Sequence, residues 1–305
     1  MLFRNFTLHP GFFESFAQTS LIARGIKKNI IQIENVNWRD EFGIGGYKQV
    51  DDKPYGGGNG MVLMVDPIYR ALQKYDAISD FFDPPTQETV HQKKTPNNSR
   101  FFEAWQKGSI KQPKVTVSLT PRGYPLNQQI VEWLSENFEE LNILCGRYEG
   151  FDHRVEEMID LEISVGDFVL NGGEAAALCL MEAVSRLRPG FITKEGSVLH
   201  DSFSTNLNRY GEHSEYIEGK RRLAINKRLR DKVAVKKIDW KNSPNLFDEK
   251  DYFKETLPRI EHPQYTRSEI WNNWKIPEVL LCGDHKKIQQ WRENWIDIGL
   301  TVMLY

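Results

Sequence analysis

The chain has 305 residues, of which 40% are hydrophobic and 27% are charged, and this composition excludes a disordered or fibrous protein. A formal net charge of -2 excludes a protein that is basic over its whole surface, so we expect any nucleic-acid partner to be held by local basic patches. No apolar run approaches the ~20 residues that cross a bilayer, and the cysteines lie far apart in the sequence, which predicts a cytoplasmic protein without a membrane segment or a structural zinc.

The first third of the chain contains one glycine-rich run and one segment without periodicity. The glycines at 56–58 and 60 precede the apolar run 61–65, a pattern of either a flexible turn or a close approach to a ligand, and the turn is favoured. Residues 79–113 contain four prolines and no helical or strand period, which predicts a loop or insertion.

Three β-branched runs follow, at 115–119, 141–144 and 163–165. They alternate with segments of helical length at 128–141 and 150–160, and this alternation predicts an α/β protein with a parallel sheet. Residues 174–188 have apolar positions at helical spacing before Pro189 and Gly190, which predicts a helix that faces the core.

Each of the three β-branched runs leads into a polar, glycine-containing loop, at 120–123, 145–150 and 166–174. In open α/β sheets ligands bind at the carboxyl ends of the strands, and glycine exposes backbone donors and acceptors there. An adenosine-containing ligand such as S-adenosylmethionine suits such loops. The glycine fingerprint of nicotinamide cofactors, the phosphate loop of nucleotide hydrolases and the serine nucleophile motif do not occur in the sequence.

The last third changes character. Residues 220–237 contain nine Lys or Arg and one acid, which fits either a basic amphipathic helix that contacts RNA phosphates or a solvated helix face. The tail from 258 is helical by pattern. Its final helix is expected to begin near Asp284 and to bury Ile288, Trp291, Trp295 and Ile298 in the core.

Several long motifs resemble one known family. The strings LCGRYEGFDHR at 144–154 and SVGDFVLNGGE at 164–174 resemble the bacterial tRNA (guanine-N1)-methyltransferases, the TrmD family, as do DDKPYGGGNGM at 51–61, PQYTR at 263–267 and the segment 283–292. The chain departs from the family pattern at Asn59, Ala176, Asn206 and Ser268.

The resemblance implies a fold and a set of partners. It implies a SPOUT-type parallel sheet with a deep trefoil knot in a cofactor domain at 1–190, a linker at 191–205, and a small, mainly helical tRNA-binding domain at 206–305 that carries an insertion at about 207–257. It also implies S-adenosylmethionine as methyl donor, help from magnesium, a homodimer with the active site between subunits, and tRNA as substrate. The methylated base is then the guanosine at position 37, next to the anticodon.

The resemblance also assigns residues to the site. It implies a cofactor cradle formed by Ser118, Leu119, Pro121, Gly146, Tyr148, Gly150, Val165, Gly166, Phe168, Leu170, Gly172 and Gly173, and a catalytic pair formed by Arg186 and Asp201. A carboxylate takes the proton from guanine N1, and a guanidinium stabilises the charge that develops on O6.

Residue chemistry alone leaves other interpretations open. By itself, Asp201 fits a helix N-cap and Arg186 fits a cation at a helix C-terminus. A SPOUT methyltransferase that acts on a ribose 2′-hydroxyl, or a non-catalytic RNA-binding relative, also fits the glycine loops.

Overall fold

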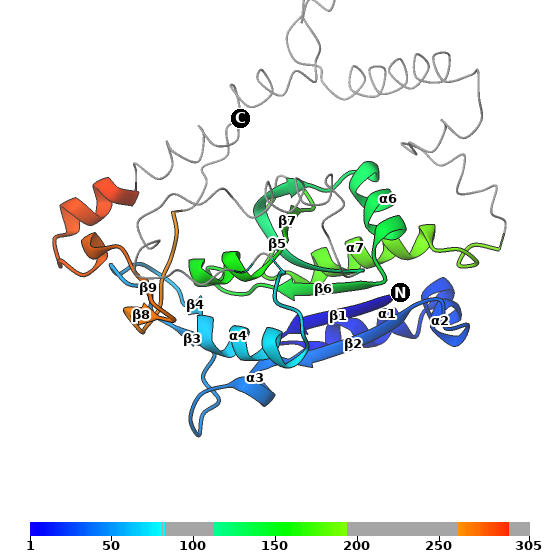
Figure 1. Ribbon diagram of the computed structural model, residues 1–305, viewed down its shortest axis with the longest axis horizontal. Helices are drawn as coiled ribbons and strands as arrows, with labels where there is room; N and C mark the ends of the chain where they lie inside the picture. Colours follow the sequence, from blue (N-terminus) through cyan, green and yellow to red (C-terminus); the bar gives the residue numbers. More distant parts are fainter. Residues whose placement is uncertain (81, 83–112, 167, 194–261, 293–305) are drawn as a thin grey trace, which may run out of the picture.

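We analysed a computed structural model, which describes residues 1–80, 82, 113–166, 168–193 and 262–292 (Figure 1). In chain order its elements are β1 (Leu2–Thr7), the 3-10 helix η1 (Pro10–Phe13), α1 (Glu14–Ala17), α2 (Ser20–Lys27), β2 (Gln32–Asn37), α3 (Trp38–Phe42), β3 (Asp51–Asp52), β4 (Val62–Leu63), α4 (Val65–Lys74), β5 (Lys114–Pro125), α6 (Gln128–Asn137), β6 (Glu140–Cys145), the 3-10 helix η2 (His153–Met158), β7 (Leu161–Ser164), α7 (Glu174–Leu187), β8 (Ile270–Trp271), β9 (Trp274–Lys275) and the 3-10 helix η4 (Glu278–Leu280). A further helix covers 285–292.

The centre of the fold is a five-stranded sheet in the order β2-β1-β6-β5-β7, and every neighbouring pair is parallel. The three strands predicted from the sequence are β5, β6 and β7, so the prediction of a parallel α/β sheet is confirmed. Helix α6 makes the crossover from β5 to β6, as expected for parallel neighbours (Figure 1). Strands β1 and β2 complete the sheet on the side of β6 and were not predicted.

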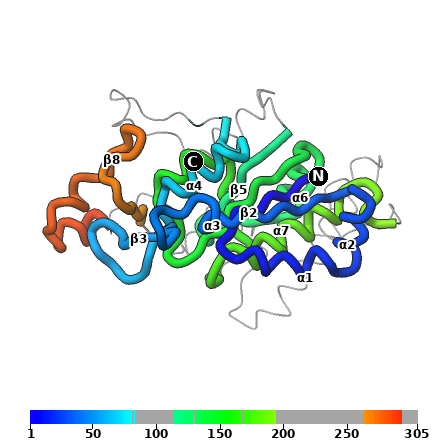
Figure 2. Tube along the Cα trace, turned by 90° about the horizontal axis from the view of Figure 1, so that it is seen from below, coloured from blue at the N-terminus to red at the C-terminus, as the bar shows by residue number. Residues whose placement is uncertain are grey.

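Helices cover both faces of the sheet, which gives three layers. One face packs against α2, α6 and α7, and this core includes Phe3, Val117, Ile143, Leu134 and Leu180. The other face packs against α3, α4 and η2, with Phe6, Trp38, Ile68, Leu72 and Met158 in its core. Figure 2 shows α1 and α7 together on one side of the strands. Two cores are expected for a sheet whose strands are buried on both faces.

The two predicted crossover segments have different outcomes. The first contains α6, where the Asn127 side chain accepts a hydrogen bond from the backbone N–H of Ile130 and so caps the helix. The second, at 150–160, forms only the six-residue 3-10 helix η2. The α-helical expectation there is wrong, because only a short stretch remains between the Asp152 cap, which accepts from the Arg154 N–H, and the start of β7 at Leu161.

Helix α7 confirms the expectation of a core-facing helix at 174–188. Met181 and Val184 are buried, and Leu178 and Leu187 are partly buried against the same core. The helix ends before Pro189, and Gly190 follows with a positive φ of 76°, a conformation that favours glycine.

The C-terminal tail is less helical than its pattern predicts. Asn272 and Asn273 have φ values of 45° and 66° between β8 and β9, which is the geometry of a two-residue hairpin turn. The final helix begins at 285, and Ile288 and Trp291 pack with Tyr265 and Leu280 as expected. Trp295 and Ile298 lie outside the described residues.

Candidate functional site

The candidate site is built from three loops at one edge of the sheet. We call residues 120–123 the first loop, 145–150 the second loop and 166–173 the third loop; the first interrupts β5 after Leu119, and the second and third follow the carboxyl ends of β6 and β7. Because these strands are parallel neighbours, all three loops lie at the same edge.

The second and third loops touch through their backbones. The Gly173 N–H donates to the Gly146 carbonyl at 2.9 Å, and Arg147 and Gly172 form an isolated antiparallel bridge. A Cβ atom on Gly173 would lie 2.8 Å from the Cα of Cys145. Glycine is therefore required for the two loops to approach this closely.

The first loop is a bulge in β5. The register shifts so that Leu119 and Tyr124 both lie opposite Ile163, and the strand then continues to Pro125 instead of ending at the loop. A Cβ atom on Gly123 would lie 2.5 Å from the backbone nitrogen of Ile163. Arg122 forms ion pairs with Glu156 and Glu162, so the first loop is held against η2 and β7.

The structure brings the predicted cofactor residues together at this edge. Ser118 and Leu119 are buried on β5, and Gly150 and Gly166 have positive φ values of 96° and 151°. In contrast, large apolar side chains in the second and third loops are exposed: Tyr148 by 53%, Phe168 by 55% and Leu170 by 40%. Exposed backbone beside apolar side chains is the lining that a small organic ligand needs, so the residues present fit an adenosine-containing cofactor. The remaining predicted positions, Pro121, Val165, Gly172 and Gly173, lie in or beside the same loops.

Of the predicted catalytic pair, Arg186 lies in the described residues and is separated from the third loop by the length of α7. Arg186 lies in the last turn of α7, whose first residue, Glu174, directly follows the third loop. At 1.5 Å per helical residue, about 18 Å of helix separates the two ends. Asp201 lies outside the described residues.

Three polar residues at the site were not singled out by the sequence analysis. Glu174 is fully buried; it forms an ion pair with Arg147 at 2.8 Å and accepts a hydrogen bond from the Thr7 hydroxyl at 2.8 Å. Arg147 also donates to the Asn171 carbonyl at 3.3 Å. The sequence signal that could have identified Arg147 and Glu174 was their position. Both charged residues stand in or directly beside glycine-rich loops that border buried strands and helices.

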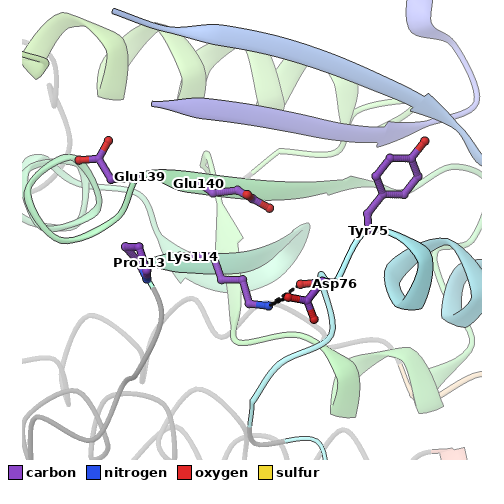
Figure 3. A pocket seen from close by; sticks show the side chains of 6 residues that line it. All are labelled: Tyr75, Asp76, Pro113, Lys114, Glu139 and Glu140. Atoms are coloured by element: carbon purple, nitrogen blue, oxygen red, sulfur yellow. Dashed lines mark hydrogen bonds and ion pairs between the residues drawn. The ribbon is translucent and has the colours of Figure 1, made fainter.

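A shallow cavity lies at the opposite edge of the sheet. It is lined by Tyr75, Asp76, Pro113, Lys114, Glu139 and Glu140, and Lys114 binds Asp76 across it (Figure 3). Lys114 and Glu140 are the first residues of β5 and β6, whereas the first loop comes after Leu119 in β5 and the second begins at Cys145, the last residue of β6. Its volume of about 280 Å³ is below the range of about 300–1,000 Å³ for small-molecule sites, so we do not assign the cofactor to it.

Comparison with known proteins identifies the family. The sequence model described as tRNA (Guanine-1)-methyltransferase TrmD matches residues 1–229 and 243–298. The chain belongs to this family. A tRNA (guanine-N(1)-)-methyltransferase from Mycoplasma capricolum is 33% identical over 96% of this chain and 86% of its own length. Another from Ruminiclostridium cellulolyticum is 34% identical over 96% of this chain and 89% of its own length.

A solved structure in the family gives a weaker likeness. The tRNA (m1G37) methyltransferase from Aquifex aeolicus is 26% identical, covers 97% of this chain and 92% of its own, and has a TM-score of 0.47. The TrmD match itself includes most of the segment 207–257 that the sequence analysis treats as an insertion, and leaves only 230–242 between its two parts.

Two further observations concern metal ions and membranes. In the described part of the chain, no His, Cys, Asp or Glu side chains gather in a group of three or more that would hold a metal ion, so nothing there supports the magnesium expectation. None of the described helices combines the length and apolar character that a bilayer-spanning helix needs.

Proposed function

We propose that this TrmD-family chain transfers a methyl group from S-adenosylmethionine to N1 of the guanosine at position 37 of tRNA, next to the anticodon. The observation that carries the proposal is the match to the family over 1–229 and 243–298, together with three glycine loops that meet at the carboxyl edge of the parallel sheet. A TrmD-type activity requires both a methyl donor and an RNA base, and the loops fit the first of these.

The proposed cradle binds the cofactor mainly through backbone groups. A Cβ atom on Gly173 would lie 2.8 Å from the Cα of Cys145, so no side chain fits at the point where the third loop touches the backbone of the second. The exposed rings of Tyr148 and Phe168 supply apolar surface for a purine or a methionine chain. When bound, S-adenosylmethionine supplies an electrophilic methyl group.

The protein's own residues then act on guanine. N1 holds a proton at neutral pH, and a ring nitrogen that keeps its proton is a poor nucleophile. In the proposed mechanism the Asp201 carboxylate accepts that proton as the methyl group arrives. The Arg186 guanidinium, which stays charged, stabilises the negative charge that develops on guanine O6. S-adenosylmethionine held by the three loops would supply the methyl group that N1 takes up, and its sulfur would keep the electron pair of the broken bond.

The position of Arg186 supports a site shared by two subunits. Because α7 keeps Arg186 about 18 Å along the helix from the third loop, we propose that Arg186 of one subunit acts at the loops of the other. The apolar side chains of Phe12, Phe168 and Val169 are 47%, 55% and 84% exposed, and burial in a homodimer would remove this surface from water. The trefoil knot, the domain boundaries near 190 and 205 and the helical tRNA-binding domain are parts of the same proposal.

The test is methyl transfer to defined tRNA transcripts. Labelled S-adenosylmethionine is incubated with the full chain and with transcripts that carry either guanosine or adenosine at position 37. We expect label only in the guanosine transcript, recovered after digestion as 1-methylguanosine. Label in both transcripts, or on a ribose 2′-oxygen, contradicts the proposal, and binding of tRNA without transfer would indicate a non-catalytic relative.

A further inference from the structure

Arg147 and Glu174 form a buried polar link across the candidate site. Glu174 is the first residue of α7 and is fully buried, and the Arg147 side chain is only 16% exposed. The ion pair joins the second loop to the start of α7, and the Thr7 hydroxyl joins the same carboxylate to the end of β1. Two strand ends and the start of a helix therefore meet at one carboxylate.

Arg147 also fixes the backbone of the third loop. Its guanidinium donates to the Asn171 carbonyl at 3.3 Å and lies 5.3 Å from the centre of the Phe12 ring. A Cβ atom on Gly172 would lie 2.3 Å from its Nε, so the third loop passes directly over the arginine side chain. Any movement of Arg147 must therefore move the third loop.

The free-energy cost of burying this ion pair indicates that the pair sets the geometry of the site rather than adding to the stability of the fold. Two buried charges lose their hydration, and replacing such a pair with apolar side chains of similar size is often neutral or stabilising. Removal of one partner alone is costly because the other charge remains buried. The Glu174 carboxylate accepts one hydrogen bond, from Thr7, and forms one ion pair, with Arg147, and these two directed contacts specify a geometry that apolar side chains cannot specify.

We propose that Arg147 and Glu174 are positioning residues that set the spacing between the second and third loops and thereby the affinity for S-adenosylmethionine. This inference rests on the proposed function, because it takes those loops to be the cofactor cradle. The pair acts on cofactor binding and leaves the proton transfer from guanine unchanged.

The test compares two single variants, a double variant and a control. Glu174→Gln and Arg147→Met each break the pair, Arg147→Met with Glu174→Leu replaces it by apolar side chains, and Glu139→Gln removes a half-exposed ion pair with Arg188 at the other end of α7. Binding of S-adenosylmethionine is measured by calorimetry, stability by urea unfolding, and methyl transfer by single turnover at saturating cofactor across pH.

We expect the dissociation constant of S-adenosylmethionine to rise about tenfold in both single variants, and the single-turnover rate and its pH profile to stay within about twofold of wild type. The double variant should unfold at a urea concentration near that of wild type and still bind the cofactor weakly. Because the double variant is expected to fold, it still tests the inference if a single variant does not fold. Glu139→Gln should bind normally.

Wild-type affinity in Glu174→Gln, or full affinity in the apolar double variant, overturns the inference. These outcomes are distinct from failure of the proposed function, in which the wild-type chain itself neither binds S-adenosylmethionine nor methylates tRNA.

Discussion

Glu174 and Arg186 lie at opposite ends of α7, so about 18 Å of helix separates the start of the helix, where the glycine loops meet, from the proposed charge stabiliser. One rigid element thus carries both halves of the proposed chemistry and keeps them apart within a subunit. We therefore propose that Arg186 of one subunit acts at the loops of a second subunit.

The Asp201 carboxylate is the proposed base, and Asp201→Asn removes it with almost no change in size. We expect the single-turnover methyl-transfer rate to fall by about 10²–10⁴, because general-base catalysis contributes that much, while cofactor affinity is unchanged. Calorimetry with S-adenosylmethionine provides the control. An equal loss of cofactor affinity would show that Asp201 supports the structure of the site.

Gly123 lies where the first loop passes β7. Gly123→Ala places a Cβ atom against the backbone of Glu162 and Ile163, so we expect the first loop to move, the free energy of unfolding to fall by about 1–3 kcal/mol, and cofactor affinity to weaken. Gly46→Ala is the matched control, since open space surrounds that position. Urea unfolding and calorimetry report the two effects. Identical results for both variants would show that the first loop tolerates the added methyl group.

Asp160 makes the free energy of unfolding depend on pH. Burial raises the pKa of this carboxyl from 3.8 to about 6, although hydrogen bonds from Ser79 and the backbone of Thr116 oppose the rise. Nearby, Asp80 raises this pKa further and Lys114 lowers it. An acid whose folded pKa is raised contributes stability below pH 4, and this contribution is lost as the pH rises through 6.

Asp160→Asn mimics the protonated acid, because its oxygen accepts from Thr116 and its amide donates to Ser79. We therefore expect the variant to gain stability relative to wild type between pH 4 and pH 6, by at most about 3 kcal/mol. Urea unfolding at several pH values measures the difference. Asp40→Asn, which alters an exposed carboxylate in contact with Lys48 and Asn37, serves as the control. Parallel curves for Asp160→Asn and wild type would contradict the assignment.

The C-terminal tail is anchored beside the second loop by Asp152. Its fully buried carboxylate accepts from the Thr266 N–H at 2.7 Å, from the Thr266 hydroxyl at 2.8 Å and from Arg154 at 2.7 Å. Thr266→Val removes one donor without changing shape, so we expect a loss of about 1–3 kcal/mol in the free energy of unfolding. Thr266→Ser keeps the hydroxyl and should lose less. A loss in Thr266→Ser that exceeds the loss in Thr266→Val would contradict this prediction, because it would show that the methyl group contributes more than the hydroxyl.

The sequence predicted the parts of the fold whose residues follow simple periods. β5, β6 and β7 are buried runs of Val, Leu and Ile, and α7 has a continuous apolar face. β1 was missed because Arg4 and Asn5 interrupt its apolar pattern; in the sheet Asn5 is fully buried and donates to Asn35 on β2. A cross-strand pair of this kind is not visible before the strands are paired.

As with the fold, part of the site could be predicted from the sequence. Glycines at strand ends indicated the three loops, and the family resemblance assigned residues to the cradle. The Arg147–Glu174 link was missed because its partners are distant in the sequence and join only when β1, β6 and α7 pack together. The bulge at 120–123 was also missed, since the register against Ile163 is a property of the paired strands.

Complementation in mixed dimers tests the shared site most directly. One variant carries Gly173→Val, which blocks the approach of the second and third loops, and the other carries Arg186→Lys, which removes the planar guanidinium. Each should be nearly inactive alone. If Arg186 acts across the interface, every mixed dimer contains one intact site, and after random exchange of equal amounts we predict about a quarter of the wild-type methyl-transfer activity. If both groups act within one subunit, every site carries a defect, and the mixture will be no more active than the separate variants.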